Sequence, residues 1–348
     1  MTRSCELDEQ FWNSKSINGF AIKSTAKKKL LLVVTMKNPP DPRSRLLFGG
    51  LGKNMRTFLN TYGQLPKMRQ ILCLLFFFGW IDSSNAAADP LILKQTCIKS
   101  LKGYKSFFKE DLLEKVCAEA AQLEGCESHE KVPIFHSDYD SQKPEAKKIL
   151  VISLIHGDEK QAGELARFWL ERLTMLEARN SWRIIPVANP DGVKNNTRTN
   201  ANGVDLNRNF PTADWGNDAV KYWEKDARKS PRKFPGKASA SEVESKCYLK
   251  HLEEYKPDFV ISIHGPLHVL DFDGPKLAQK PKYEYLPWKS LGNYPGSLGR
   301  YLWVERSIPV LTTELSNSLP ATEKPFEQLQ DLIGTLVKTQ LKGPGSLK

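Results

Sequence analysis

The sequence predicts an α/β protein in which a mixed, largely parallel sheet is sandwiched between helices in a single domain. Apolar runs of strand length alternate with amphipathic helical segments between residues 147 and 341. The apolar runs lack the strict alternation of apolar and polar residues that marks a sheet with one solvated face. We therefore expect helices on both faces of the sheet.

Four apolar runs are predicted to be strands because each has strand length and is bounded by turn residues or by a change to helical periodicity. The predicted strands are KKILVISLI (147–155), WRIIPVAN (182–189), DFVISIHG (258–265) and IPVLTTEL (308–315). Their separation by helical segments favours parallel pairing, since a parallel connection needs a crossover of a dozen or more residues.

Three segments are predicted to be helices. The segment 159–173 carries Leu165, Trp169 and Leu173 at four-residue spacing, as a helix facing a core would. The segment SEVESKCYLKHLEEY (241–255) opens with a serine and, three residues later, a glutamate, which is the spacing of a capping box. Residues 323–341 are predicted to form a terminal helix.

Charge is distributed unevenly along the chain. The 348 residues are 40% apolar and 26% charged, which suits a globular protein with a large core, and the formal net charge is +11. Residues 1–88 hold 13 Lys or Arg against 5 Asp or Glu, whereas the remaining residues hold 38 against 35. Because the globular part is close to neutral and has no basic stripe, we expect no nucleic-acid partner.

An export signal is predicted ahead of the globular part. The apolar stretch ILCLLFFFGWI (71–81) follows Lys67 and Arg69 and precedes SSNAAADP, a small-residue site for cleavage after about Ala88. The stretch is shorter than the roughly 20 apolar residues of a spanning helix, so we expect no stable membrane span. The protein is accordingly predicted to be exported, in a periplasmic location. A buried core helix is the alternative for this stretch.

Five parts are predicted along the chain. Met68 is the natural first residue of the signal, which leaves a basic extension ahead of it that is either a misassigned upstream region or a disordered tail. The parts are the extension (1–67), the signal peptide (68–88), a lead-in segment (89–130), the main domain (131–341) and a tail (342–348).

Four cysteines follow the predicted cleavage site, at Cys97, Cys117, Cys126 and Cys247. In an exported chain they permit two disulfides with three possible pairings, and four buried free thiols are the alternative. None of them has the C-x-x-C spacing of a zinc site, so we do not expect the cysteines to hold a metal.

A metal site is predicted where strands end. His156 follows the strand 147–155, Glu159 begins the next helix three residues later, and His264 ends a separate strand. Open α/β sheets place their ligands at such strand ends. Two imidazoles and one carboxylate form the ligand set of a catalytic zinc site that leaves one coordination position for water.

Residues 189–211 are predicted to form a long loop, because Pro-Asp-Gly and Asn-Gly steps dominate the stretch. Long ordered loops in compact domains are usually functional. Arg198 and Arg208 lie in this stretch among several asparagines, a combination that suits recognition of a carboxylate or of a developing oxyanion. A solvated polar loop is the alternative. Beyond it, Glu314 closes an apolar strand; its neighbours favour a position in a cleft, and exposure at the rim of the sheet is the alternative.

Six motifs, in this order, resemble those of the M14 metallocarboxypeptidases. They are HGDE (156–159), NPDG (189–192), R-T-N (198–200), GVDLNRNFP (203–211), SIHGP (262–266) and TTEL (312–315). The resemblance covers residues 130–340. Within this family, the chain most resembles the murein peptide amidase A branch, the γ-D-glutamyl-meso-diaminopimelate peptidases. Two features carry that resemblance: the short spacing between the third and fourth motifs, and the segment NYPGSLG (293–299).

The resemblance implies a zinc-dependent peptidase domain that hydrolyses an amide next to a free carboxylate, with a murein peptide as substrate and partner. It implies one zinc ion per chain, held by His156, Glu159 and His264. It also implies that Glu314 is the general base and acid and that Arg198 polarises the scissile carbonyl.

The resemblance extends to residues that hold the substrate. Asn207 and Arg208 match the positions that bind its terminal carboxylate, and Tyr294 matches a mobile tyrosine that caps it. Asp205 matches a carboxylate that orients the first ligand histidine. Arg300 is a candidate for the distal carboxylate of diaminopimelate, and a solvent-exposed arginine is the alternative.

Three other functions remain open from the sequence. A general metallocarboxypeptidase would share all six motifs and remove ordinary C-terminal residues. An aspartoacylase-like deacylase shares the H-x-x-E and D-L-N-R elements, but R-T-N and TTEL favour the peptidase. A non-catalytic binding module would lack a ligand or the base, and neither is missing. The oligomeric state does not follow from the sequence.

Overall fold

The computed structural model describes residues 20–21, 35–36, 89–109, 111–277 and 279–340. The chain divides into two units, residues 1–84 and residues 85–348. In the first unit, β1 (Phe20–Ala21) pairs antiparallel with β2 (Thr35–Met36). The predicted signal peptide and the tail lie outside the described residues. Within the described ranges, no helix is long and apolar enough to cross a bilayer.

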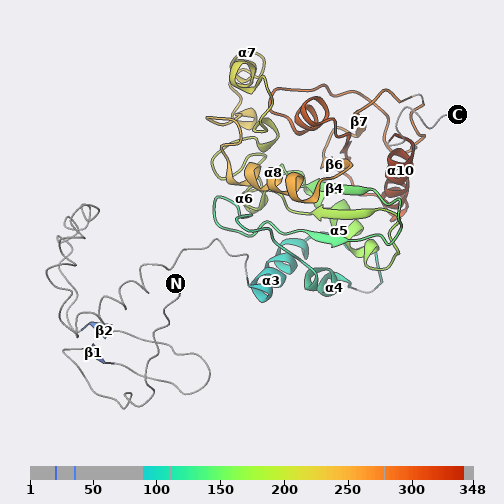
Figure 1. Cartoon of the computed structure of the whole chain (residues 1–348), viewed down its shortest axis with the longest axis horizontal. Helices are drawn as coiled ribbons and strands as arrows, with labels where there is room; N and C mark the ends of the chain where they lie inside the picture. The colour runs from blue at the N-terminus through green and yellow to red at the C-terminus, as the bar shows by residue number, and fades with distance from the viewer. Residues whose placement is uncertain (1–19, 22–34, 37–88, 110, 278, 341–348) are drawn as a thin grey trace, which may run out of the picture. The chain divides into compact units, whose positions relative to one another are not determined.

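A mixed sheet of six strands forms the centre of the described part of the second unit (Figure 1). The strand order is β3-β5-β4-β6-β8-β7, in which the four inner strands are parallel and both edge strands are antiparallel. This order confirms the predicted mixed, largely parallel sheet. The strands are β3 (Ser137–Tyr139), β4 (Lys148–Ser153), β5 (Ser181–Ile185), β6 (Phe259–His264), β7 (Val269–Asp273) and β8 (Val310–Glu314).

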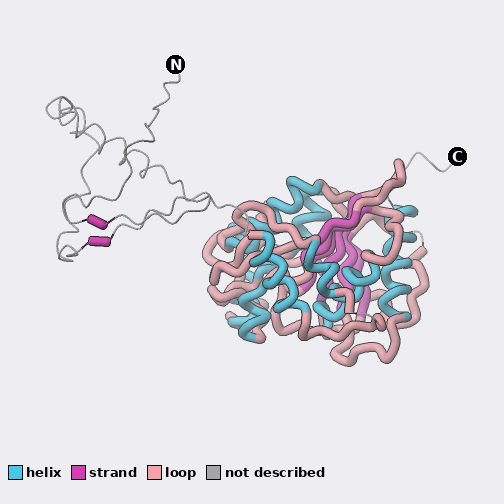
Figure 2. Tube along the Cα trace, turned by 90° about the horizontal axis from the view of Figure 1, so that it is seen from below, coloured by secondary structure: helices cyan, strands magenta, loops and turns pink. Residues whose placement is uncertain are grey.

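Helices cover both faces of this sheet (Figure 2). The first face packs against α3 (Pro90–Leu101), α4 (Leu113–Ala118), α5 (Lys160–Leu173) and α10 (Lys324–Gln340). The second packs against α8 (Val243–Tyr255), α9 (Leu298–Arg300) and the π-helical turn Tyr301–Glu305. Along β4, Ile149 and Val151 enter the first core and Leu150 and Ile152 the second. Burial on both sides explains why the strands show no polar alternation.

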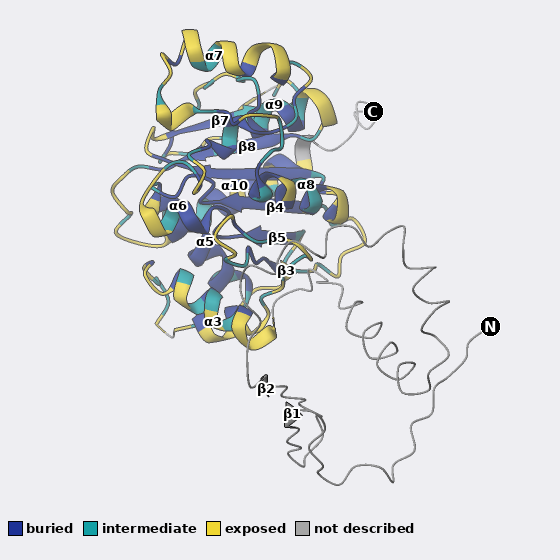
Figure 3. Cartoon of the chain, turned by 90° about the vertical axis from the view of Figure 1, so that its left-hand side faces the viewer, coloured by how far each residue is buried: buried dark blue, intermediate teal, exposed yellow. Residues whose placement is uncertain are grey.

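The remaining helical elements lie between β5 and α8. They are α6 (Pro190–Asn195), α7 (Val220–Lys225), the π-helical turn Trp215–Ala219 and two 3₁₀ turns, Leu206–Arg208 and Pro231–Lys233. Helix α7 has no buried residue and lies on the outside of the unit (Figure 3).

Two local predictions are wrong. The stretch 189–211 is not wholly loop, because Asn189 caps α6 through the backbone N–H of Gly192 at 2.9 Å and Pro190 takes its first position. The capping box at 241–255 is absent, since α8 begins at Val243 without a side-chain cap. The Glu244 carboxylate instead accepts hydrogen bonds from two other segments, which compete with the local cap.

Of the two disulfides, one lies within the lead-in segment and the other joins that segment to the main domain. Cys97 in α3 pairs with Cys117 in α4, and Cys126 pairs with Cys247 in α8. Three pairings were open from the sequence, and the alternative of four free thiols is wrong. The loops closed by the two bonds differ greatly, with sequence separations of 20 and 121 residues.

The two bonds should contribute unequally to stability, because closing a longer loop removes more entropy from the unfolded chain. The pair Cys126→Ser/Cys247→Ser should lower the free energy of unfolding by about 4 to 5 kcal/mol, and Cys97→Ser/Cys117→Ser by about 3 kcal/mol. Urea unfolding of the oxidised proteins measures both. Equal losses would show that native-state strain, and not loop length, sets the contribution.

A pair of buried histidines lies close to the second disulfide. His136 and His251 are 3% and 0% exposed, and their ring centroids are 4.9 Å apart. Neither ring nitrogen of His251 has a partner within the described residues. Burial, with the charge of Arg183 nearby, lowers the pKa of His136 to about 4, and burial lowers the pKa of His251 well below its ordinary value. Both rings are therefore neutral at pH 7.

The fold should lose stability in acid through these two rings. Unfolding restores their pKa to about 6.5, so between pH 6.5 and pH 4 the unfolded chain binds more protons than the folded chain. Each histidine then costs up to about 1.4 kcal/mol per pH unit as the pH falls. Urea unfolding from pH 7.5 to pH 4.5 should give a shallower pH slope for His251→Gln than for the wild type. The exposed His268→Asn serves as control, and an unchanged slope in His251→Gln contradicts the assignment.

Candidate metal centre and active site

The candidate site lies at the carboxyl ends of the central strands. β5 follows β4 in the chain and lies on one side of it, whereas β6 lies on the other side. Such a reversal opens a crevice beyond the carboxyl ends of the two strands. His156 comes three residues after β4, Glu159 immediately precedes α5, and His264 is the last residue of β6.

The structure brings these three side chains together. His156 Nδ1 lies 2.7 Å from Glu159 Oε1, His264 Nδ1 lies 2.9 Å from Glu159 Oε2, and the two Nδ1 atoms lie 3.1 Å apart. All three residues are buried, with at most 5% of each exposed. The pKa of Glu159 is below its usual range: burial alone would raise it, but the two imidazoles facing the carboxylate outweigh burial.

A close backbone contact fixes the turn that carries His156. A Cβ atom on Gly157 would lie 1.9 Å from the carbonyl carbon of Gly192. The HGDE turn and the start of α6 can therefore pack together only without a side chain at position 157. The Asn189 amide, which donates to Ile155 O at 3.2 Å, ties the same two segments together.

Asp205 supports the cluster from behind. Its carboxylate is fully buried and lies 3.1 Å from His156 Nε2, on the ring edge opposite Nδ1. It also accepts a hydrogen bond from Arg198 Nε at 3.0 Å. Burial alone would raise the pKa of Asp205, but Arg198 and His156 hold it far below its ordinary value. A permanent carboxylate here favours the tautomer in which His156 Nδ1 is free to bind a cation.

The cluster fits a zinc ion. His156, Glu159 and His264 each offer one ligand atom, and these atoms lie within 4.8 Å of one another. Two imidazole nitrogens and a carboxylate oxygen are a donor set that zinc accepts while keeping a position open. The described residues hold one other group of this kind, Cys126, Cys247 and His251, but its two sulfurs are joined in a disulfide.

A cavity of about 90 Å³ adjoins the cluster, and His264, Arg198, Asn207, Arg208 and Tyr294 are among its lining residues. The predicted substrate-binding residues therefore share one cavity. Asn207 follows Asp205 in a 3₁₀ turn, and its side-chain oxygen accepts the backbone N–H of Leu298 at 2.8 Å. The guanidinium of Arg208 lies 4.6 Å from the ring centroid of Tyr294.

Glu314 lies in a strand whose residues line this inner cavity and is followed by residues that line a second one. It ends β8, pairs in register with His264, and is 9% exposed. Side chains at paired positions point to the same side of a sheet, so its carboxylate faces the side on which His264 lies. Thr312 lines the inner cavity, whereas Leu315 and Ser316 line the second. Glu314 itself is not among the lining residues of either cavity.

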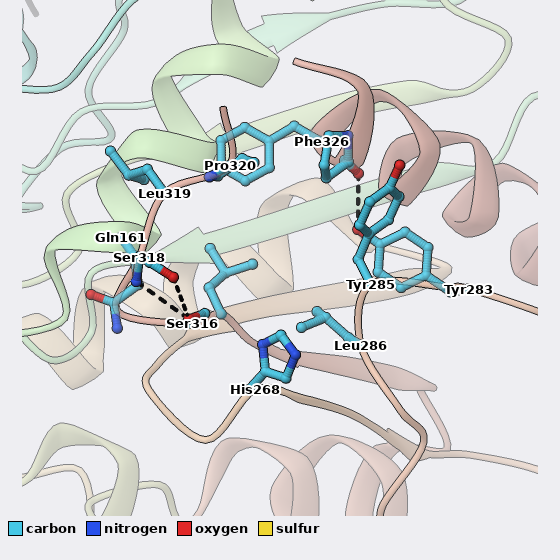
Figure 4. Close-up of a pocket in the computed structure, with 12 residues that line it drawn as sticks. Gln161, His268, Tyr283, Tyr285, Leu286, Ser316, Ser318, Leu319, Pro320 and Phe326 are labelled. Atoms are coloured by element: carbon cyan, nitrogen blue, oxygen red, sulfur yellow. Dashed lines mark hydrogen bonds between the residues drawn. The ribbon is translucent and has the colours of Figure 1, made fainter. Parts of the chain in front are cut away.

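The second cavity has a volume of about 200 Å³ and is lined mostly by apolar and aromatic residues (Figure 4). Tyr283, Tyr285 and Leu286 form one wall, and His268 extends toward them (Figure 4). His268 is exposed and is not one of the clustered ligands.

Several motif residues hold the loop and do not face the inner cavity. Asn200 is 3% exposed, and its amide donates to Glu242 and Glu244 at 2.9 and 3.0 Å. Asn209 is fully buried and donates to the carbonyls of Pro235 and Ala238. Of these three asparagines, Asn207 alone lines the inner cavity and remains a candidate for substrate recognition.

Arg300 is not among the lining residues of the inner cavity. Its guanidinium pairs with Asp214 Oδ2 at 2.6 Å. Sequence reasoning assigned no role to several residues that line the cavity, among them Ser262, Asp271, Asp273 and Thr312. Ser262 and Thr312 could have been found, because each lies two positions before a predicted site residue and strand side chains repeat every two residues.

The fold and the site define a zinc carboxypeptidase. The sequence profile of that family, Peptidase_M14, matches residues 120–285. Murein peptide amidase A of Escherichia coli K12 is 33% identical over 194 residues, which are 53% of this chain and 78% of that protein. The chain therefore belongs to the M14 zinc carboxypeptidase family and is a metallopeptidase.

Solved structures agree on the fold. Carboxypeptidase A from Helicoverpa armigera superposes with a TM-score of 0.51 at 17% identity, over 71% of this chain and 79% of that one. Murein-tripeptide amidase from E. coli O157 is 25% identical, covers 62% of this chain and 91% of its own, and has a TM-score of 0.47. By sequence, the particular proteins that this chain is similar to include murein peptide amidases.

Removing one predicted ligand should remove the metal. His264→Ala leaves one imidazole and one carboxylate, so the protein should lose about one zinc per chain, and its activity, in metal analysis after dialysis. Glu314→Gln is the matched control, because a residue outside the ligand set should leave the zinc content unchanged while turnover falls. Loss of zinc from Glu314→Gln would make Glu314 a ligand, and full activity in His264→Ala would refute the ligand set.

Proposed function

We propose that the protein hydrolyses murein peptides at the amide between γ-D-glutamate and meso-diaminopimelate. The observation that carries this proposal is the polar cavity beside the metal cluster, which is lined by Asn207 and Arg208. These are the two residues that the sequence resemblance assigns to the terminal carboxylate of the substrate. The relatives named murein peptide amidase A support the choice of peptide. Such a substrate presents a free carboxylate to these two residues.

The proposed chemistry divides between the metal and the chain. A zinc ion held by His156, Glu159 and His264 would act as a Lewis acid. It would also lower the pKa of a bound water molecule, which would then lose a proton and act as the nucleophile near neutral pH. Glu314 would take the proton of the attacking water and deliver it to the leaving amine. Its pairing with His264 supports this role, because paired side chains lie on the same side of a sheet.

Arg198 would stabilise negative charge that develops on the scissile carbonyl oxygen. It lines the inner cavity, and its Nη1 lies 3.4 Å from Glu159 Oε1, so its charge is close to the metal cluster. Asp205 holds the other edge of the guanidinium and limits its movement. A preorganised donor of this kind typically contributes a factor of about 10² to 10³ in kcat.

We also propose that the protein works outside the cytoplasm. The predicted export signal at residues 71–81 motivates this location. The disulfides Cys97–Cys117 and Cys126–Cys247 support it, since such bonds persist in oxidising compartments.

The test of the substrate is a direct comparison of peptides. L-Ala-γ-D-Glu-meso-diaminopimelate should be cut with a kcat/KM at least about 100-fold above those of peptides ending in Phe or Leu, since a pocket built for polar groups rejects residues that lack them. Mass spectrometry of the products identifies the bond. Glu314→Gln, run in parallel, excludes a contaminating peptidase. Faster cleavage of an ordinary peptide would leave a general carboxypeptidase.

A further inference from the structure

Two carboxylates of β7 line the same inner cavity as the two arginines. Asp271 and Asp273 lie in its wall together with Asn293, and Arg198 and Arg208 lie in its wall as well. The cavity therefore carries both signs of charge. None of the roles described above uses the two aspartates.

The sheet register explains why these aspartates reach the cavity. Asp271 pairs with Thr312 of β8, and Thr312 pairs with Ser262 of β6. All three residues line the cavity, and paired residues share one face of a sheet. Asp273 lies two residues further along β7 and so points to the same face. His264 and Glu314 therefore lie on the same face of the sheet as the two carboxylates, which belong to the edge strand β7.

The two carboxylates have no cationic partner of their own. Within the described residues, no Lys, Arg or His nitrogen lies within the 4.0 Å ion-pair distance of either one. Asp271 is 7% exposed and accepts the backbone N–H groups of Phe272 and Leu291. Burial, and then the charge of Asp271, raise the pKa of Asp273 to about 6. A cation placed between them would relieve this repulsion.

Gly299 makes room for the second carboxylate. A Cβ atom on Gly299 would lie 2.1 Å from Asp273 Oδ2 and 3.4 Å from the side-chain oxygen of Asn293. Gly299 itself lines the cavity. The carboxylate of Asp273 therefore occupies space that any other residue at position 299 would claim.

An independent observation at Arg208 points to a ligand in this cavity. Arg208 is 8% exposed, and its Nε is buried without a hydrogen-bond partner among the described residues. Burial lowers the pKa of this guanidinium, and the charge of Arg198 acts in the same direction. A buried donor left unpaired is costly, and an anionic ligand would satisfy it. The cavity thus offers one end to an anion and the other to a cation.

We infer that Asp271 and Asp273 bind the side-chain ammonium group of the same substrate residue whose free carboxylate lies at Arg208. The inference rests on the proposed function, because it names the group that this cavity selects; in a murein peptide that group is the second amine of diaminopimelate. Asp271 and Asp273 are thereby specificity-determining residues. Arg300, the sequence-based candidate for the far end of this side chain, pairs with Asp214 instead.

The spacing along the sheet suits a long, straight side chain. Val269 pairs with Glu314, Asp271 with Thr312 and Asp273 with Val310. Two strand residues span about 7 Å, so Asp271 lies about 7 Å along the sheet from the level of Glu314, and Asp273 about 14 Å. The level of Asp271 is therefore within reach of an extended lysine or diaminopimelate side chain and beyond a short one, and Asp273 would approach the ammonium group from the far side.

The experiment compares two matched pairs of substrates that differ only in the side-chain amine. The first pair is L-Ala-γ-D-Glu followed by meso-diaminopimelate or by 2-aminopimelate. The second is benzoyl-glycine followed by lysine or by norleucine. The ratio of kcat/KM within each pair is measured for the zinc-loaded wild type, Asp271→Asn, Asp273→Asn and the control Asp140→Asn, whose carboxylate is exposed and outside the cavity.

The wild type should prefer the amine-bearing member of the pair that it cleaves. Asp273→Asn and Asp271→Asn should each reduce that ratio by about 10- to 100-fold, as loss of a charged partner from a buried ammonium implies, and Asp140→Asn should keep it. Gly299→Ala, which displaces Asp273, should reduce the ratio in the same way and gives a second route if an Asn variant does not fold. Zinc content and thermal unfolding report whether each variant is folded.

The outcomes separate this inference from the proposed function. Cleavage of the murein pair with equal rates for both members, or with a ratio that survives Asp273→Asn and Asp271→Asn, overturns the inference and leaves the proposed function standing. Cleavage of the benzoyl-glycine pair alone, with a preference for lysine that both Asn variants remove, supports the inference and overturns the murein substrate.

Discussion

The buried carboxylate of Asp205 is the interaction on which the site depends. One oxygen lies against His156 Nε2 and the backbone N–H of Asn207, and the other accepts from Arg198. A single side chain thereby orients a predicted metal ligand, a predicted oxyanion donor and the turn that presents Arg208. Because Asp205 is fully buried, its charge costs free energy unless these partners stay in place. Removing any one partner leaves the others less well held.

The sheet forms another wall of the site, because the residues on one of its faces change from apolar to polar along the strands. On the second face, Val260 and Val310 enter the apolar core, but two and four residues later the same strands present Ser262, His264, Thr312 and Glu314. The polar end of that face lies at the strand ends where the crevice opens. The edge strand β7 runs in the opposite direction, so its carboxylates extend the polar region away from the metal cluster. One face of one sheet therefore supplies both packing and chemistry.

Much of this could be read from the sequence, and the failures have physical causes. Length and periodicity located four inner strands and three long helices. The edge strands β3 and β7 were missed, because each is short and lacks a sustained apolar run. The three clustered residues could be predicted from the sequence. His156 and Glu159 flank one strand-to-helix turn, and His264 ends another strand at the same edge of the sheet. Asp271 and Asp273 could not be predicted, because only the register of β7 against β8 brings them to the cavity. The disulfide pairing likewise needed the packing of α3, α4 and α8.

The contact between Gly157 and Gly192 limits which substitutions these two positions can accept during evolution. Gly157 has backbone atoms of another segment within 2.4 Å of where its Cβ would be, and Gly192 has the Asn189 side chain and the Thr199 carbonyl within 2.8 Å. A methyl group at either place would have to move the turn that carries His156, whereas Gly103 has nothing within 4 Å of its Cβ position. In a population of neutral variants, alanine should thus accumulate at position 103 while the two motif glycines stay fixed together.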